Sequence, residues 1–358
     1  MMSGIPSTRP VDSSMPAEED VLLDVRGLCV DVDGARGPVR LVNDVSFTVR
    51  RGEAVALVGE SGSGKTLTAC AVMNLFATPQ LRRASGEVWL EGRNLTTLGP
   101  AEMRAVRGAR VGMVFQDPSS FLDPLMPVGR QIGQALRAHG RREGVEARVL
   151  ELIELMELPQ PAQTAAKYPH ELSGGQRQRI LIAAALAMEP ALLIADEPTT
   201  ALDVTVQAEI LKLLVRLRER LRLGVLLITH DLGVVAQTCQ RVNVMYAGEL
   251  VERAEVGPLF TAPRHPYTQG LLRSVLGRST RREALFSIPG GVPIAGQWPV
   301  GCRFHPRCPQ AEAGHCDQEA PALQSEGGSS ASRCHFAADP RILHAWDAAQ
   351  DSGQGVTA

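Results

Sequence analysis

The chain has 358 residues, enough for about two compact domains with a sizeable buried core. Hydrophobic residues make up 44% of it and charged residues 21%, a balance typical of a folded globular protein. The 37 basic and 39 acidic residues give a net charge of -2, which excludes the overall positive field of a non-specific nucleic-acid binder. Apolar runs are too short for a membrane-spanning helix, and residues 1–20 lack a signal-peptide pattern, so we expect a cytosolic chain.

The expected elements begin after an N-terminal arm, residues 1–20, that lacks periodicity and is expected to be disordered. Residues 21–49 alternate apolar and polar side chains around a Gly/Pro turn, which predicts a β-hairpin. An apolar run at 54–58 predicts a buried parallel strand, and helical spacing follows at 65–76. Further apolar runs of buried-strand length lie at 111–115, 191–195 and 225–229.

Helical patterns fill the segment between about residues 118 and 188. One helix there is expected to place four apolar residues on one face: Val149, Leu150, Ile153 and Met156. Two further helices are expected at 174–188 and at 206–221, the second as the outer layer of a βαβ arrangement.

A change in composition toward Pro, Gly, Cys and His follows Glu252, and we place a domain boundary near residue 256. The expected domains are therefore 21–255 and 256–336, followed by a small, polar and disordered tail at 337–358.

A phosphate-binding loop of the pattern G-x-x-x-x-G-K-[ST] lies between the first buried strand and a helix. Its residues are Gly59, Glu60, Ser61, Gly62, Ser63, Gly64, Lys65 and Thr66. Backbone N–H groups and the helix dipole would hold a phosphate chain, Lys65 would bridge the β- and γ-phosphates, and Thr66 would bind Mg²⁺. The alternative is a glycine-rich turn with a chance lysine, but the chain has only three lysines.

Two adjacent carboxylates, Asp196 and Glu197, end the apolar strand predicted at 191–195. Consecutive strand residues point to opposite sides, so the two should have different roles. We expect Asp196 to hold Mg²⁺ and Glu197 to act as the general base toward the attacking water. Solvated acids at a strand end are the alternative.

A second anion-binding helix terminus is predicted where Leu172 is followed by Ser173, Gly174, Gly175 and Gln176. Alone, the serine could be an ordinary helix N-cap. In this company the segment resembles the signature motif of ATP-binding cassette proteins. The resemblance implies an α/β fold: a RecA-like P-loop NTPase core, an antiparallel β subdomain, an inserted helical signature subdomain at about 118–188 and a small Cys-rich C-terminal extension, with ATP and Mg²⁺ as ligands.

Three more residues match motifs of that family in the expected order. Gln116 matches the Q-loop glutamine, which in the family senses Mg²⁺ and the γ-phosphate. Asp203 matches the D-loop, and His230 matches the switch histidine that contacts the γ-phosphate. A structural role is the alternative for a lone histidine after a strand.

The resemblance also implies a dimer, because the family holds ATP between the phosphate loop of one subunit and the signature of the other. Ser173 and Gly175 would then act on the ATP of a second cassette subunit, either a copy of this chain or a related one. Many members stack adenine on an aromatic residue after the first strand, and residues 30–43 contain none. Val39 or Leu41 would have to provide an apolar surface instead.

Several segments resemble the peptide and nickel import branch of the family, and the likeness extends over about residues 21–336. They are Tyr168-Pro-His-Glu, Val244-Met-Tyr-Ala-Gly-Glu, His265-Pro-Tyr-Thr, Ile288-Pro-Gly and Gly301-Cys-Arg-Phe-His-Pro-Arg-Cys. The resemblance implies the ATPase subunit of an importer for dipeptides, oligopeptides or a related small solute. It would lie peripherally on the cytoplasmic face of the inner membrane, on two integral-membrane permease subunits served by an external solute-binding protein.

Four of the seven cysteines, Cys302, Cys308, Cys316 and Cys334, lie within 33 residues. In a cytosolic chain this clustering favours a metal site over disulfides. Their spacing is too loose for paired C-x-x-C zinc knuckles, and four thiolates match the ligand set of a [4Fe–4S] cluster or of a Cys₄ zinc site. We expect a structural iron–sulfur cluster, with zinc or scattered reduced thiols as the alternatives. Substitute ligands would be His305, His315 and His335.

A different class of function, a soluble cassette ATPase acting on DNA or ribosomes, is the main alternative. The DNA-repair members place a long coiled coil between the phosphate loop and the signature, whereas here 106 residues without heptads separate Thr66 from Ser173. The translation-factor members carry two cassettes, and exporter halves usually carry fused membrane helices. We therefore expect an importer ATPase with no nucleic-acid partner.

Overall fold

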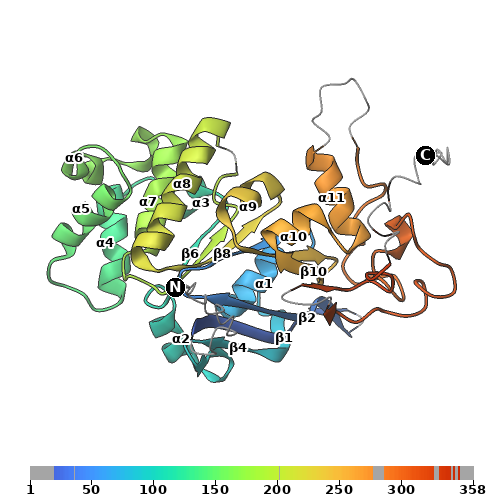
Figure 1. Cartoon of the computed structure of the whole chain (residues 1–358). Helices are drawn as coiled ribbons and strands as arrows, with labels where there is room; N and C mark the ends of the chain where they lie inside the picture. Colours follow the sequence, from blue (N-terminus) through green and yellow to red (C-terminus); the bar gives the residue numbers. More distant parts are fainter. Residues whose placement is uncertain are drawn as a thin grey trace, which may run out of the picture.

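The computed structural model describes residues 20–35, 37–200, 202–276, 286–325, 330–339, 342 and 346. The N-terminal arm and most of the C-terminal tail expected from the sequence lie outside these residues. Figure 1 shows two sheets at the centre and helices on one side. The described residues from 256 onward, called the C-terminal part below, lie on the other side.

The smaller sheet is antiparallel, with the strand order β2-β1-β4-β5. Its strands are β1 (Val21–Gly34), β2 (Gly37–Arg50), β4 (Leu81–Leu90) and β5 (Arg93–Asn94). The hairpin predicted at 21–49 is confirmed as the β1–β2 pair, in which Gly34 lies opposite Gly37. The short helices η2 (Leu95–Thr97) and α2 (Pro100–Val106) follow β5.

The larger sheet has the order β11-β12-β10-β9-β3-β8-β7-β6. Five strands are parallel: β3 (Ala54–Val58), β6 (Val111–Val114), β7 (Leu192–Asp196), β8 (Gly224–Thr229) and β9 (Arg241–Tyr246). Every residue of β3, β7 and β8 is buried, as in a parallel sheet covered on both faces. The antiparallel strands are β10 (Glu249–Glu255), β11 (Gln324–Ser325) and β12 (Ala331–Ser332).

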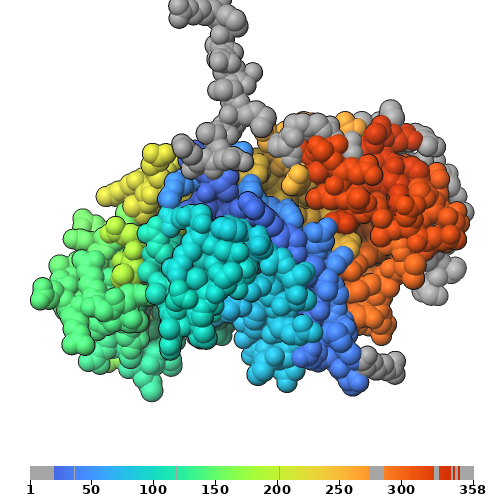
Figure 2. Space-filling model, turned by 90° about the horizontal axis from the view of Figure 1, so that it is seen from below, coloured from blue at the N-terminus to red at the C-terminus, as the bar shows by residue number. Residues whose placement is uncertain are grey.

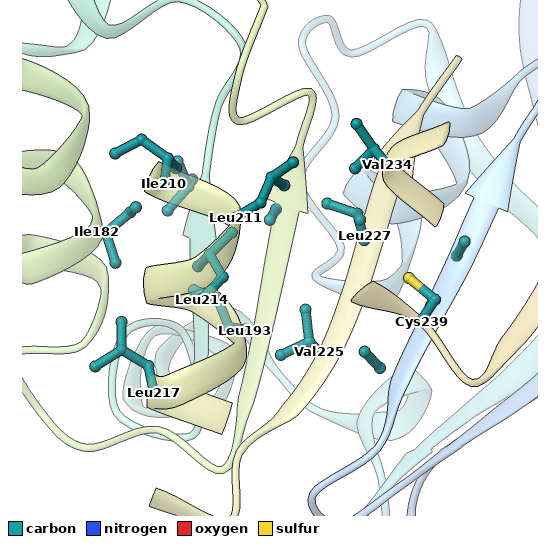
Figure 3. Packing of buried hydrophobic residues seen from close by; sticks show 14 of the residues in the cluster. Ile182, Leu193, Ile210, Leu211, Leu214, Leu217, Val225, Leu227, Val234 and Cys239 are labelled. Carbon is teal, nitrogen blue, oxygen red and sulfur yellow. The ribbon is translucent and has the colours of Figure 1, made fainter. Parts of the chain in front are cut away.

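Helices cover the parallel strands through apolar side chains. Figure 3 shows Ile210, Leu214 and Leu217 of α8 (Val204–Leu221) between Ile182 on one side and the strands β7 and β8 on the other. The other helices of the core and of the C-terminal half are α1 (Lys65–Val72), α9 (Leu232–Thr238), α10 (Val256–Thr261) and α11 (Pro266–Leu276). α1 ends four residues earlier than predicted, because Asn74 has a left-handed φ of 49° and Arg107 donates to the carbonyls of Met73 and Asn74.

A group of helices lies between β6 and β7 in the chain. It comprises α3 (Pro118–Phe121), α4 (Val128–Ala138), α5 (Val145–Leu155), α6 (Pro161–Ala166), η3 (Pro169–Glu171) and α7 (Gly174–Ala185). The face predicted for α5 is wrong at one position, since Leu150 is exposed and Leu152 is buried. On a helix, Leu152 lies between Val149 and Met156 on one face, whereas Leu150 is rotated about 100° away from Val149.

The C-terminal part lies opposite the helical group in both Figure 1 and Figure 2. It joins the larger sheet through β12, which pairs with β10. It also enters the core, where the rings of Tyr246, Tyr267 and Phe304 pack with centroids 4.7 to 5.4 Å apart. No helix in the described residues is long and apolar enough to span a bilayer.

Candidate functional site

The phosphate-binding loop predicted at residues 59–66 follows β3 and leads into α1. Gly59 has φ 151°, and a Cβ atom there would lie 2.2 Å from the carbonyl oxygen of Met245. Gly64 caps α1 with a left-handed φ of 101°. Glycine is therefore required at Gly59 by the close approach of β9 and is favoured at Gly64 by its dihedral angle.

Lys65 is buried and turned back onto its own loop. Its Nζ atom donates to the carbonyl oxygens of Gly59 at 2.7 Å and of Glu60 at 2.9 Å. Burial lowers the pKa of Lys65, although the carboxylates of Glu197 and Asp196 act in the opposite direction. The ammonium group thus lies beside the loop, where it could exchange these carbonyl contacts for phosphate oxygens.

Thr66 and Asp196 bring two oxygen atoms together next to the phosphate loop. Thr66 Oγ1 donates to Asp196 Oδ1 at 3.2 Å, and the Asp196 side chain is buried at the end of β7. Burial raises the pKa of Asp196, an effect that the hydrogen bond from Thr66 partly offsets. A hydroxyl and a carboxylate are ligands that Mg²⁺ prefers, so this pair fits that ion.

Glu197 is the centre of a polar network at the carboxyl ends of β6, β7 and β8. Its carboxylate accepts hydrogen bonds from Thr200 Oγ1 at 2.8 Å and Gln116 Nε2 at 3.0 Å, and lies 3.1 Å from Nδ1 of His230. Burial acts to raise the pKa of Glu197, but the Thr200 and His230 contacts and the charge of Lys65 outweigh it and hold that pKa below its ordinary value. Glu197 also has a left-handed φ of 45°, a strain typical of functional residues.

A cleft of about 370 Å³ opens over the phosphate loop. The residues that line it come from the phosphate loop and the start of α1, from the Glu197 network, and from other segments: Ser61, Gly62, Gly64, Lys65, Thr66, Leu67, Gln116, Glu197, Leu41, Ala295 and Trp298. Its volume lies within the range of small-molecule sites. Thr200, Ala295 and Trp298 are not among the site residues predicted from the sequence. Only Thr200 carried a nearby signal, as a hydroxyl three residues after the predicted base.

The signature residues and Asp203 act as helix caps in this chain. Ser173 Oγ accepts from the backbone N–H of Gln176 at 3.3 Å, and Gln176 Oε1 accepts from that of Ser173 at 3.0 Å. Asp203 Oδ1 accepts from Val206 N–H at 3.0 Å and caps α8. None of these residues, nor Gly174 or Gly175, is among the described residues that line the cleft. The structure thus brings together the sites predicted at 59–66, 116, 196–197 and 230, and leaves the signature and Asp203 outside them.

The C-terminal part contacts the phosphate loop at Glu60 through Arg307 and Tyr267. The guanidinium of Arg307 faces the Glu60 carboxylate with N–O distances of 3.0 and 3.2 Å, and its Nε atom donates to the carbonyl of Pro289 at 2.8 Å. The Tyr267 hydroxyl accepts from the backbone N–H of Glu60 at 2.8 Å. The contacts of Arg307 and Tyr267 with Glu60 join residues more than 200 positions apart, and no local sequence pattern indicated them.

The four clustered cysteines are free thiols around one small cavity, which Phe304 and His265 also line. Burial, together with the neighbouring thiols, raises the pKa of Cys302 to about 11 and those of Cys308 and Cys334 to about 12. Across the described residues, no three His, Cys, Asp or Glu side chains are arranged to hold one metal ion. The expected metal centre is therefore not formed around a single point.

Two family models match the chain. The model described as ABC transporter covers residues 42–200, and the model described as the oligopeptide/dipeptide transporter C-terminal region covers residues 251–316. A probable peptide ABC transporter ATP-binding protein of Sinorhizobium fredii is 48% identical over 88% of this chain and 95% of its own length. The dipeptide transport ATP-binding protein DppD of Escherichia coli is 43% identical over 89% of this chain and 97% of its own.

Solved structures with a similar fold include an ATP-binding cassette in a dimeric, post-hydrolysis state with ADP and Pi. It is 28% identical, has a TM-score of 0.58, and aligns over 66% of this chain and 99% of that one. The protein cbiO1 of Clostridium perfringens, part of the transporter complex cbiONQ, is 27% identical with a TM-score of 0.59, over 68% of this chain and 92% of its own. These likenesses confirm the expected cassette fold, with its α/β core and antiparallel sheet.

Proposed function

Because this chain belongs to the ABC transporter family, among its peptide-import ATP-binding proteins, we propose that it hydrolyses ATP to drive the import of dipeptides, oligopeptides or a related small solute. The observation that carries this proposal is the cleft in which the phosphate loop faces the Glu197 network. A phosphate cradle and a positioned carboxylate together are what hydrolysis of a phosphoanhydride requires.

Different residues of the chain have different roles in the proposed hydrolysis. The backbone of residues 59–64 binds the phosphates, and Lys65 moves from the loop carbonyls to the β- and γ-phosphates. Thr66 and Asp196, with Gln116, would hold Mg²⁺, which supplies charge neutralisation on the phosphate oxygens. Glu197 takes the proton of the attacking water.

His230 contacts the Glu197 carboxylate through Nδ1 and orients it. When ATP is bound, His230 would contact the γ-phosphate. Its side chain is mostly exposed, with 63% of its surface accessible, so it is free to turn toward a bound nucleotide.

The test of this function is Glu197→Gln. The amide keeps the shape of the side chain but cannot take a proton, so turnover should fall about 10²- to 10⁴-fold while ATP still binds. Phosphate release and ATP titration measure the two effects. Lys65→Ala is the matched variant and should weaken ATP binding itself. Undiminished turnover in Glu197→Gln would remove Glu197 from this role.

We infer that α3–α7 form the signature subdomain and that the chain works as a nucleotide-sandwich dimer. Ser173 at the capped start of α7 is exposed and does not line the chain's own cleft, as expected for a group that serves a partner's ATP. One related cassette was solved as a dimer with ADP and Pi, which supports the same arrangement here.

Attachment to permease subunits, on the cytoplasmic face of the membrane, is proposed through the segment after Gln116. Phe121 and Leu125 there are 50% and 87% exposed, an apolar surface suited to a protein partner. Leu125→Glu should reduce co-purification with the coexpressed permease subunits and leave the basal ATPase rate intact. Co-purification that survives Leu125→Glu and Phe121→Glu together would contradict this surface.

A [4Fe–4S] cluster bound by Cys302, Cys308, Cys316 and Cys334 is our proposal for the cysteine cavity. In such a cluster each thiolate binds a different iron, and the support for the proposal is that all four thiols line one cavity. Bound iron would stabilise the thiolate forms of Cys308 and Cys334, whose pKa values burial raises. The cluster would be structural.

Metal analysis tests the cluster. Protein purified without oxygen should be brown and contain iron and acid-labile sulfide in equal amounts, whereas zinc would give a colourless protein with one metal per chain. Cys308→Ser should make residues 290–336 sensitive to protease while the Glu197 chemistry persists. Metal-free protein whose C-terminal part resists protease would leave the cysteines as reduced thiols.

A further inference from the structure

Part of the cleft is lined by residues that belong neither to the phosphate loop nor to the Glu197 network. Leu41 of β2 lies beside Ala295 and Trp298 of the C-terminal part, and all three line the cleft together with Ser61 and Thr66. Trp298 is the only aromatic residue among the described residues that line this cleft. Residues 30–43, which include Leu41, contain no aromatic side chain that could take this role.

The indole of Trp298 is fixed by contacts on two of its sides. Its Nε1–H donates to the carbonyl oxygen of Arg40 at 2.8 Å, which ties it to β2. The guanidinium carbon of Arg303 lies 4.7 Å from the ring centroid. A cation at this distance over an aromatic face is attractive, so the ring is held in place before any ligand arrives.

The segment that carries Trp298 is anchored on both β2 and the phosphate loop. Gly296 packs on Val39 so closely that a Cβ atom at Gly296 would lie 3.1 Å from Val39 Cγ1. Arg307 links Pro289, at the start of the segment, to Glu60 of the phosphate loop. The distance between the indole and the phosphate cradle is therefore set by contacts within the chain, as a site for a base joined to a triphosphate requires.

We propose that Trp298 and Leu41 form the nucleobase subsite of this chain, with the base stacked on the indole. The inference rests on the proposed function, because it places the base of the same nucleotide whose phosphates lie on Lys65. Stacking on an aromatic ring is chemically sufficient to hold a base. Since the Nε1–H of Trp298 is already bonded to Arg40, the indole offers no hydrogen bond that reads the base. Stacking on this ring does not itself distinguish adenine from guanine, so we expect Trp298 to contribute to the binding of both nucleotides.

Three probes test the subsite by titration calorimetry: a non-hydrolysable ATP analogue, the matching GTP analogue and inorganic tripolyphosphate. Trp298→Ala should weaken binding of both nucleotides about tenfold or more and leave tripolyphosphate unchanged, because only the stacked base is lost. Trp298→Phe should restore most of the affinity. Trp89→Phe, on the antiparallel sheet, is the matched control and should bind all three probes like the wild type.

Fluorescence supplies a second readout. ATP binding should quench tryptophan emission in the wild type and in Trp89→Phe, and should do so much less in Trp298→Phe, although this variant still binds ATP. Wild-type nucleotide affinity in Trp298→Ala would overturn the subsite, as would an equal loss of tripolyphosphate binding. Failure of the proposed function has a different signature, namely Lys65→Ala binding tripolyphosphate as tightly as the wild type.

Discussion

The carboxylate of Glu197, the proposed general base, is held by side chains that follow three strands. Gln116, Thr200 and His230 all contact Glu197, and they hold it ionised in a half-buried place. The sequence could predict Glu197, Gln116 and His230, because each stands next to an apolar strand in a known order. Thr200 could not be chosen in the same way, since a hydroxyl at that position has many other uses.

The Thr200 hydroxyl gives a prediction about pH. It lowers the pKa of Glu197, so Thr200→Val should raise that pKa, and the carboxylate should then become protonated at a higher pH. Because the general base must be ionised, the acid limb of the ATPase pH profile should move to higher pH. Thr200→Ser retains the hydroxyl and serves as the control. An acid limb that stays in place in Thr200→Val would show that this hydrogen bond does not tune the base.

At the scale of the elements, the hydrophobic pattern predicted four of the five parallel strands and did not predict β9. β3 has the predicted bounds, and β6, β7 and β8 begin or end within one residue of them, because short apolar runs in a covered sheet have little freedom. The end of α1 was missed, since Asn74 and the side chain of Arg107 decide it. The contacts of Trp298 and Arg307 were missed as well, because they depend on how distant segments pack.

The Arg307–Glu60 pair joins η4 (His305–Arg307) to the phosphate loop and predicts a measurable coupling. The free energy of unfolding can be measured by denaturant titration for Arg307→Ala, Glu60→Ala and the double variant. The coupling free energy between the two residues should be about 1–3 kcal/mol, because Arg307 is buried and faces both carboxylate oxygens. The exposed Arg82–Asp33 pair is the control and should give less than about 1 kcal/mol. Equal couplings for the two pairs would show that the phosphate loop does not depend on this contact.

At the scale of the whole molecule, the cleft over the phosphate loop is lined by that loop and not by the start of α7, so we expect Ser173 to serve the ATP of a second subunit. If two copies of this chain pair, Lys65→Ala and Ser173→Arg subunits should complement each other on mixing. Half of the dimers would be mixed and each would keep one intact composite site, so about a quarter of the wild-type ATPase rate should return. No recovery, although native mass spectrometry detects the mixed dimers, would contradict the sandwich arrangement.

The pairing of β12 with β10 has a consequence for any shortened form of the protein. Glu252 and Arg253 lie opposite Ser332 and Ala331, and the backbone N–H of Arg333 donates to the carbonyl of Val251 at 2.8 Å. A chain cut at residue 255 would leave these β10 backbone groups bare along a sheet margin, ready to pair with another molecule. Such a fragment should self-associate. The C-terminal part would therefore protect the preceding cassette from aggregation by covering the edge of β10.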